Sequence, residues 1–280
     1  MAYNFNPLNH PICLQQPHRL VHPGAWVEHI PFGMLLIDLV RPKIFVELGT
    51  HSGNSYCAFC QAVQELSLPT LCYAVDTWEG DKQSGNYDSE VLEDLRKHHD
   101  PLYNQFSRLM QTTFDHAVED FDDRTIDLLH IDGLHTYDAV SHDFETWLPK
   151  MSDQGIVVLH DTVVRERDFG VWKLWQELNN SHPSFEFSHG HGLGIIAVGR
   201  KIEPEIEHFL SINDGVKEVR DLFHRLGSRL SWELSSTIQS NIAIELKSEL
   251  QEKENTIKTL EANLSEKEQE ILSYALSNSW

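Results

Sequence analysis

Residues 43–53, which read KIFVELGTHSG, decide the fold that this sequence predicts. The short apolar run from Ile44 to Val46 is typical of a strand that is buried on both faces. Gly49 and Gly53 then form a turn in which backbone amides can approach a ligand without an intervening side chain. Residues 55–65 read as a helix. A strand, a glycine turn and a helix in this order begin the nucleotide-binding crevice of an open α/β sheet.

The turn also indicates which ligands suit it. Its spacing is not G-x-G-x-x-G, so the pyrophosphate fingerprint of dinucleotide enzymes is absent. Glu47, just before the turn, would repel a phosphate. This acidic residue favours a ligand with cationic or hydroxyl groups.

The composition restricts the partners of the chain. Its 280 residues are 40% hydrophobic, which allows a normal packed core, and its formal net charge is -21. Nucleic acid is not expected as a partner, because phosphate backbones need a basic surface. No signal peptide and no apolar stretch of transmembrane length is found, which predicts a cytoplasmic protein. The cysteines are expected to be buried free thiols; they are Cys13, Cys57, Cys60 and Cys72.

The rest of the chain alternates strands and helices. Further strands are expected at 71–75, 106–110, 126–131, 155–159, 185–187 and 193–198, and further helices at 25–40, 112–121, 137–148 and 171–180. This alternation predicts a mainly parallel sheet with helices on both faces. The last two strands lack an intervening helix and predict a hairpin. The predicted fold is α/β: a Rossmann-like seven-stranded, mostly parallel sheet with one antiparallel strand, followed by a C-terminal helical coiled-coil segment.

Four segments are expected along the chain: an extended N-terminal arm (1–24), a sheet domain (25–200), a helical connector (201–240) and a coiled-coil helix (241–280). Apolar residues at a seven-residue spacing indicate the coiled coil, over about four heptads. One seam position holds Ala243, Leu250, Ile257, Leu264 and Ile271, and the other holds Leu246, Lys253, Leu260, Lys267 and Tyr274. The two lysines weaken the seam, and a lone solvated helix is the alternative. We expect this helix to form a homo-oligomer or to fold back.

Acidic residues follow three of the predicted strands: Asp76, Asp132 and Asp161. Because the carboxyl ends of parallel strands share one crevice, these side chains are expected to converge. Asp76 stands where adenosine-binding sheets hold ribose hydroxyls; an exposed turn aspartate is the alternative. Asp132 and Asp161, with His160, suit a divalent cation and leave positions open for water and substrate. The alternative is that both aspartates cap the segments that follow them.

Three motifs make residues 26–199 resemble the class I methyltransferases that use S-adenosylmethionine (SAM), in particular a family-24-like sugar and glycan O-methyltransferase subgroup. They are D-T-W-E-G-D at 76–81, D-G-L-H-T-Y at 132–137 and H-D-T at 160–162. The resemblance implies SAM as cofactor, and Mg²⁺ or another divalent metal held by Asp132, His160 and Asp161. The cofactor-binding residues expected from it are Glu47, Gly49, Thr50, Gly53, Asp76, Thr77, Trp78 and Asp132. The chain departs from the Mg²⁺ enzymes by placing His160 and Thr162, instead of an acid or amide, beside the last metal aspartate.

The expected reaction is methyl transfer from SAM to a hydroxyl of a sugar or glycan. His135 is expected to take the proton of the hydroxyl, with Asp132 as its catalytic neighbour. Trp78, Tyr87 and the loop 188–192 are the expected acceptor contacts. Alternatives are a non-catalytic SAM-binding scaffold that oligomerises through the C-terminal helix, a methyltransferase for a non-sugar hydroxyl, and a nucleotide-sugar or NAD enzyme on the same sheet. The last residues, Ser277 to Trp280, resemble a linker of polysaccharide-assembly proteins, so the chain is expected to belong to a larger glycan-assembly protein.

Overall fold

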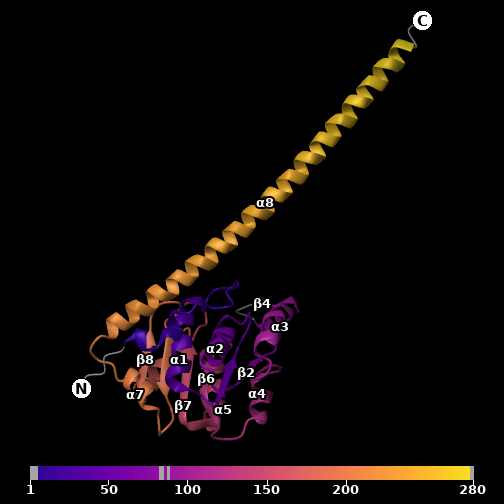
Figure 1. The fold of residues 1–280 in the computed structure, drawn as a ribbon. Coiled ribbons are helices and arrows are strands. Elements are labelled where there is room, and N and C mark those ends of the chain that lie inside the picture. Colours follow the sequence, from indigo (N-terminus) through magenta and orange to yellow (C-terminus); the bar gives the residue numbers. More distant parts are fainter. Residues whose placement is uncertain (1–5, 82–84, 87–88, 278–280) are drawn as a thin grey trace. The chain divides into compact units, whose positions relative to one another are not determined.

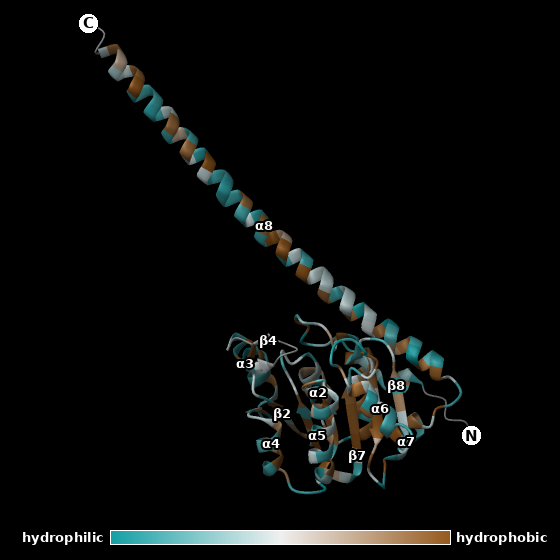
Figure 2. Cartoon of the chain, turned by 180° about the vertical axis from the view of Figure 1, so that it is seen from behind, coloured by the Kyte–Doolittle hydropathy of each residue, from teal (hydrophilic) through white to brown (hydrophobic). Residues whose placement is uncertain are grey.

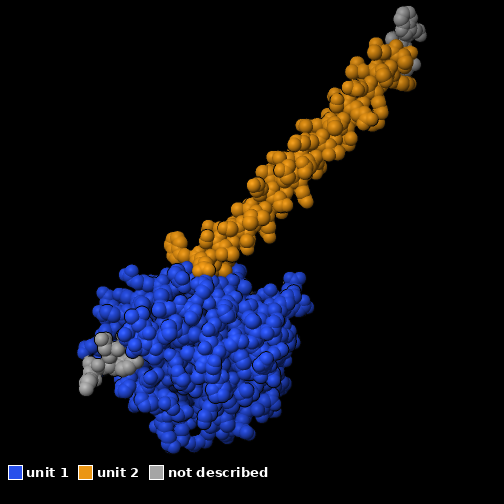
Figure 3. Space-filling view, viewed as in Figure 1, with its two compact units in different colours: residues 1–231 blue, residues 232–280 orange. Residues whose placement is uncertain are grey.

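The computed structural model describes residues 6–81, 85–86 and 89–277. The chain divides into two compact units, residues 1–231 and residues 232–280, which Figure 3 shows in different colours. The first unit contains the sheet and its covering helices, and the second unit is helical.

The first unit is built on a seven-stranded sheet with the order β5-β2-β1-β6-β7-β9-β8 (Figure 1). Its strands are β1 (Ile44–Leu48), β2 (Leu71–Asp76), β5 (Ser107–Gln111), β6 (Ile126–Ile131), β7 (Met151–His160), β8 (Ser184–Phe187) and β9 (Leu193–Ala197). Strand β9 is antiparallel to both β7 and β8, while the pairs from β5 to β7 are parallel. The predicted fold class is confirmed. A separate two-residue pair, β3 (Gly80–Asp81) and β4 (Gly85–Asn86), was not expected.

Helices cover both faces of this sheet. They are α1 (Ile30–Val40), α2 (Asn54–Glu65), α3 (Glu90–Tyr103), α4 (Phe114–Ala117), α5 (Tyr137–Trp147), α6 (Val171–Leu178) and α7 (Pro204–Leu210), followed by α8 (Val216–Ser277). Val46 and Leu48 of β1 belong to a buried cluster with side chains of α4, α5 and α6. Phe45 points to the other face, where its ring lies 4.6 Å from that of Phe59 in α2. Burial on both faces explains why β1 is apolar without alternation.

The described part of the N-terminal segment, residues 6–24, is not an extended arm. It contains two short 3-10 helices, Pro7–Asn9 and Pro11–Leu14. Cys13 is buried, and Gln61 of α2 donates a hydrogen bond to the Gln16 carbonyl over 3.0 Å. The segment is therefore packed onto the sheet unit, which its lack of apolar periodicity did not predict. All four cysteines are buried and free, as expected.

Helix α8 begins at Val216 and continues without a break to Ser277, so no irregular connector separates it from the predicted coiled-coil segment. Within the second unit, the described residues 232–277 are all helical. Apolar seam side chains such as Leu250 and Leu264 are about 60% exposed in the single chain. Figure 2 shows hydrophilic and hydrophobic residues mixed along this helix, while β7 is mostly hydrophobic. Among the described residues, no helix has the length and apolar character needed to cross a membrane.

Candidate active site

The carboxyl ends of four neighbouring strands lie level with one another. Leu48 of β1 is in register with Val75 of β2 and with Ile131 of β6, and Ile131 is in register with Leu159 of β7. The residues that follow these four positions therefore form a row across the end of the sheet. They are Asp76, Gly49, Asp132 and His160, and all of them line one cavity of about 1300 Å³.

Most of the expected site residues lie at this cavity. Its lining includes Gly49, Thr50, Asp76, Thr77, Asp132, His135, His160 and Asp161. The structure thus brings the three strand-end aspartates together, as expected from the topology. Glu47, Gly53 and Trp78 are not among its lining residues, and Tyr87 lies outside the described part of the chain.

The two glycines of the turn are required by the backbone. Gly49 has a φ of +88°, and a Cβ there would lie 2.1 Å from the carbonyl oxygen of Asp132. Gly53 has a φ of +80°, and a Cβ there would lie 2.5 Å from a methyl group of Leu95. Only glycine accommodates such positions without strain. Gly49 therefore lets the turn lie directly against the end of β6. Gly53 is the N-cap residue of α2 and lets the start of this helix pack against Leu95.

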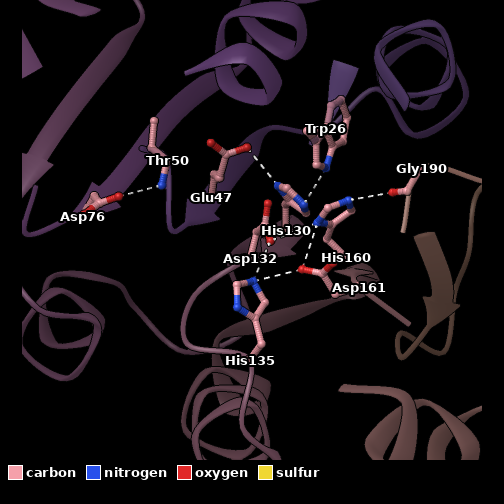
Figure 4. Close-up of polar contacts among 10 residues, drawn as sticks. All are labelled: Trp26, Glu47, Thr50, Asp76, His130, Asp132, His135, His160, Asp161 and Gly190. Carbon is pink, nitrogen blue, oxygen red and sulfur yellow. Dashed lines mark hydrogen bonds and ion pairs between the residues drawn. The ribbon is translucent and has the colours of Figure 1, made fainter. Parts of the chain in front are cut away.

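Asp76 holds the glycine turn in place. Its Oδ2 accepts hydrogen bonds from the backbone amides of Thr50, over 2.9 Å (Figure 4), and His51, over 2.8 Å. Its Oδ1 accepts one from the Trp78 amide over 2.8 Å. A carboxylate has about four acceptor positions, two on each oxygen, so Oδ2 is fully used and Oδ1 retains capacity for one hydroxyl donor. Asp76 can therefore organise the turn and bind a ribose at the same time.

Trp78 also stabilises the glycine turn through a hydrogen bond. Its side chain is buried, and its indole N–H donates to the His51 carbonyl over 2.9 Å. The expected acceptor contact through its aromatic face is not supported, because that face is packed inside the protein. Of the loop 188–192, His191 lines the cavity, and the Gly190 carbonyl lies 3.1 Å from His160 Nε2.

Glu47 is completely buried beneath the cavity. Its Oε2 lies 2.8 Å from Nδ1 of His130, whose Nε2 accepts a hydrogen bond from the Trp26 indole N–H over 3.2 Å (Figure 4). Because the indole nitrogen can only donate, His130 carries its proton on Nδ1 and donates it to Glu47. Burial raises the pKa of Glu47, while the hydrogen bond from His130 opposes this rise. The side chain expected to contact a ligand is thus used to join β1 to β6.

Two aspartates and two histidines form a compact cluster at the ends of β6 and β7. His135 Nε2 lies 2.9 Å from Asp161 Oδ2 and 3.5 Å from Asp132 Oδ1. His160 Nδ1 lies 3.1 Å from Asp132 Oδ1 and 3.3 Å from Asp161 Oδ2. Figure 4 shows all four side chains directed toward one another. The carboxylates raise the pKa of both imidazoles against the opposing effect of burial, to about 9 for His135.

The donor atoms of this cluster fit a divalent metal ion. Ligand atoms of Asp132, His135 and Asp161 all lie within 4.8 Å of one another, as do those of His160, Asp161 and His191. His160 can donate from Nε2 to the Gly190 carbonyl, which leaves Nδ1 free as a ligand; such second contacts commonly orient metal-binding histidines. Mixed carboxylate and imidazole donors suit first-row transition ions better than Mg²⁺, which prefers oxygen. His135, expected as a base, also belongs to this donor set.

Two further parts of the cavity wall were not expected. Residues 163–169 after β7 contribute Arg165, Arg167 and Phe169, and the Phe169 ring stacks on His135 with centroids 4.6 Å apart. Asp143 of α5 also lines the cavity, although it is buried. A signal for Asp143 was present in the sequence, because it falls at core spacing between Val140 and Trp147. No comparable pattern distinguished residues 163–169.

Comparisons with known proteins bear on the same region. Residues 46–162 match the family model described as a methyltransferase domain. The uncharacterized protein y4gI of Sinorhizobium fredii is 47% identical over 201 residues, which cover 72% of this chain and 22% of that protein. The chain thus spans about a fifth of the length of this curated relative. The family match confirms the resemblance to SAM-dependent methyltransferases that the motifs indicate.

The solved structures that are similar to this chain include two methyltransferases with a bound cofactor or its product. The methyltransferase PaMTH1 of Podospora anserina, bound to S-adenosylhomocysteine (SAH), has 15% sequence identity and a TM-score of 0.46, covering 70% of this chain and 97% of that one. The O-methyltransferase TomG of Streptomyces achromogenes, in complex with SAM, has 13% identity and a TM-score of 0.47, covering 64% of this chain and 82% of that one.

Proposed function

From the methyltransferase domain that residues 46–162 match, we propose that this chain is a SAM-dependent O-methyltransferase that methylates a hydroxyl of a sugar or glycan. The observation that carries the proposal is the single cavity of about 1300 Å³, in which the glycine turn and Asp76 lie on one side and the cluster of Asp132, His135 and Asp161 on the other. One side suits a nucleoside cofactor, and the other suits the activation of a hydroxyl.

In this proposal, the cofactor lies over the glycine turn. Gly49 and Thr50 offer backbone close to the cavity, and Asp76 binds a ribose hydroxyl with the remaining acceptor position of its Oδ1. The acidic lining also favours a ligand with a net positive charge, which a sulfonium cofactor has. SAM supplies an already activated methyl group, so the protein mainly aligns the acceptor with it. Glu47 is not included among the direct contacts, because it faces His130.

The acceptor hydroxyl is proposed to meet the cluster at the ends of β6 and β7. His135, held by stacking on Phe169, is proposed to accept its proton once a cation on Asp132 and Asp161 offsets their charge and lowers the pKa of His135 from about 9. Asp132, Asp161 and His160 are the proposed metal ligands, and a bound divalent cation would lower the pKa of the hydroxyl. A sugar or glycan acceptor is proposed from the D-G-L-H-T-Y and H-D-T motifs, which resemble those of sugar O-methyltransferases.

The seam of α8 is proposed to associate with a second copy of this chain. The proposal rests on the repeated apolar positions from Ala243 to Ile271 and on the exposure of side chains such as Leu250 and Ile257 in the single chain. In this proposal residues 241–280 serve assembly and residues 25–200 hold the methyltransferase site, while residues 201–240 include the start of the same helix α8. The much greater length of the relative y4gI is compatible with a role within a larger glycan-assembly protein.

The proposed activity can be tested with the full chain, SAM and a panel of glycan, sugar and non-sugar hydroxyl acceptors. We expect SAH to form with a glycan or sugar acceptor, and the Asp132→Ala variant to lose this turnover while it still binds SAH. A chain that binds SAH but methylates no acceptor in the panel would favour the non-catalytic scaffold. Calorimetry that shows preference for NAD or a nucleotide sugar over SAM would contradict the proposal.

A further inference from the structure

Asp143 is a buried carboxyl group that opens onto the cavity. Only 7% of the residue is exposed, yet it is among the cavity-lining residues. Its Oδ2 lies 3.5 Å from the point that a Cβ on Gly133 would occupy. Gly133 directly follows Asp132, whose carbonyl lies against the Gly49 turn. The carboxyl group therefore lies beside the part of the site proposed to hold the nucleoside.

Nothing in the described part of the chain satisfies this carboxyl group. Thr136, not Asp143, caps α5, by accepting a hydrogen bond from the Ala139 amide over 3.3 Å. The neighbouring His142 is directed to Asp115, 2.7 Å away. Burial raises the pKa of Asp143 to about 7, with His142 opposing and Asp115 adding to the rise. The carboxylate borders the cavity without a donor from the described residues, so it can accept a hydrogen bond from a bound ligand.

The surfaces around Asp143 are suited to a flat aromatic group. Phe114 lines the cavity, and its ring lies so close to Gly133 that a Cβ there would be 2.5 Å from the ring. Leu134 also lines the cavity and is 36% exposed, so its apolar side chain is accessible to a ligand there. A polar acceptor between apolar surfaces is the usual arrangement of a site that orients a heterocycle.

We propose that Asp143 recognises the adenine of the bound cofactor by accepting a hydrogen bond from its exocyclic amine. This inference rests on the proposed function, because it takes the nucleoside to lie across the ends of β2, β1 and β6. Asp76 then binds the ribose, and Phe114 and Leu134 contact the faces of the base. The Asp143 carboxylate accepts a hydrogen bond at the edge of the base. A base with a carbonyl oxygen in place of the amine would present a second hydrogen-bond acceptor to this carboxylate, and the hydrogen bond would be lost.

The test compares the binding of SAH and S-inosylhomocysteine, in which that oxygen replaces the amine, by calorimetry at pH 8.5. The wild-type chain is expected to bind SAH about tenfold or more tightly than the inosine analogue, as for a lost hydrogen bond to a charged group. The Asp143→Asn variant keeps the shape but offers an N–H₂ donor to the oxygen. Its preference for SAH is expected to fall below about threefold.

Asp115→Asn is the matched control, since it removes one carboxylate from the same wall and is expected to keep the wild-type preference. Equal binding of the two ligands by the wild-type chain would overturn the inference while leaving SAM binding intact. An unchanged preference in Asp143→Asn would overturn it as well. Failure of the wild-type chain to bind SAH at all would instead overturn the proposed function, and the two failures are therefore distinguishable.

Discussion

Glu47 and His130 are register partners on the neighbouring strands β1 and β6, and their side chains form a completely buried hydrogen bond of 2.8 Å. Trp26, which lines the cavity, fixes the far nitrogen of the same imidazole. The acid before the glycine turn therefore supports the floor of the site through the sheet. Removing one member of such a buried pair is costly, because it leaves the other member without its hydrogen-bond partner.

The first prediction concerns this pair. Glu47→Ala should lower the free energy of unfolding by about 2–4 kcal/mol, because it leaves the His130 N–H buried without an acceptor and creates a cavity. Glu47→Gln, which keeps an acceptor oxygen, should lose less. Urea unfolding measures both changes. We expect Glu47→Gln to bind SAH within about threefold of the wild-type chain. A Glu47→Gln variant with normal stability but lost SAH binding would show that Glu47 contacts the ligand directly.

Glu47 also marks how far the sequence could predict this site. The positions of the strands along the chain followed from apolar runs. The rule that parallel strands end at one edge predicted that Asp76, Asp132 and Asp161 converge, and they lie at one cavity as expected. The direction of a side chain next to a turn does not follow from that rule. Glu47 lies one residue before Leu48, so the pleat of β1 directs it into the protein rather than toward the crevice.

Other parts depended on contacts between segments far apart in sequence. Trp78 is buried, and its indole N–H donates a hydrogen bond to the His51 carbonyl. Asp143 lines the cavity because α5 packs beside Gly133. The N-terminal segment is packed because Arg19 donates to the Ser52 carbonyl over 2.8 Å. No local pattern encodes such partners. Asp143 is an exception, because a polar residue at a helix position where the spacing predicts a core side chain can be recognised in the sequence.

The second prediction concerns the turn. Asp76→Asn should weaken SAH binding by about tenfold to a hundredfold, because the amide group cannot accept hydrogen bonds from Thr50, His51 and Trp78 together. Calorimetry gives the affinity. The control is Thr77→Ala, a cavity-lining change on the same loop that leaves these bonds in place and should cost less than the Asp76 variant. Equal losses in both variants would contradict the role given to Asp76.

The third prediction concerns the metal. The wild-type chain, purified without chelator and dialysed against Mn²⁺, should retain the ion, and Asp161→Asn should weaken its binding by at least about tenfold. Elemental analysis and Mn²⁺ titration measure this without requiring turnover. SAH affinity should change little, since Asp161 lies away from the glycine turn. Asp115→Asn serves as a charge-matched control. Equal Mn²⁺ affinity in Asp161→Asn and the wild-type chain would remove the cation from the proposal.

The fourth prediction concerns pH. The pKa of Asp143 rises from 3.8 to about 7 on folding, so above pH 4 the unfolded chain loses this proton while the folded chain keeps it. This group therefore stabilises the folded state at low pH, and that contribution is lost as the pH rises toward 7. Asp143→Asn removes the dependence. Its free energy of unfolding, relative to the wild-type chain, should increase by about 2 kcal/mol between pH 5 and pH 8. A difference that stays constant over this range in urea unfolding would show that the folded carboxyl is not desolvated.

The last prediction concerns α8. Seam residues Ile257 and Leu264 are 54% and 61% exposed in the single chain, an exposure that a paired coiled coil would remove. The full chain should therefore sediment as an oligomer, and the double variant Ile257→Asp/Leu264→Asp should sediment as a monomer because charges on the seam cannot be buried. Leu272→Asp is the matched control, since Leu272 is 62% exposed on the same helix but lies off the seam. It should leave the oligomer intact. A wild-type chain that is monomeric at micromolar concentrations would instead favour the lone solvated helix.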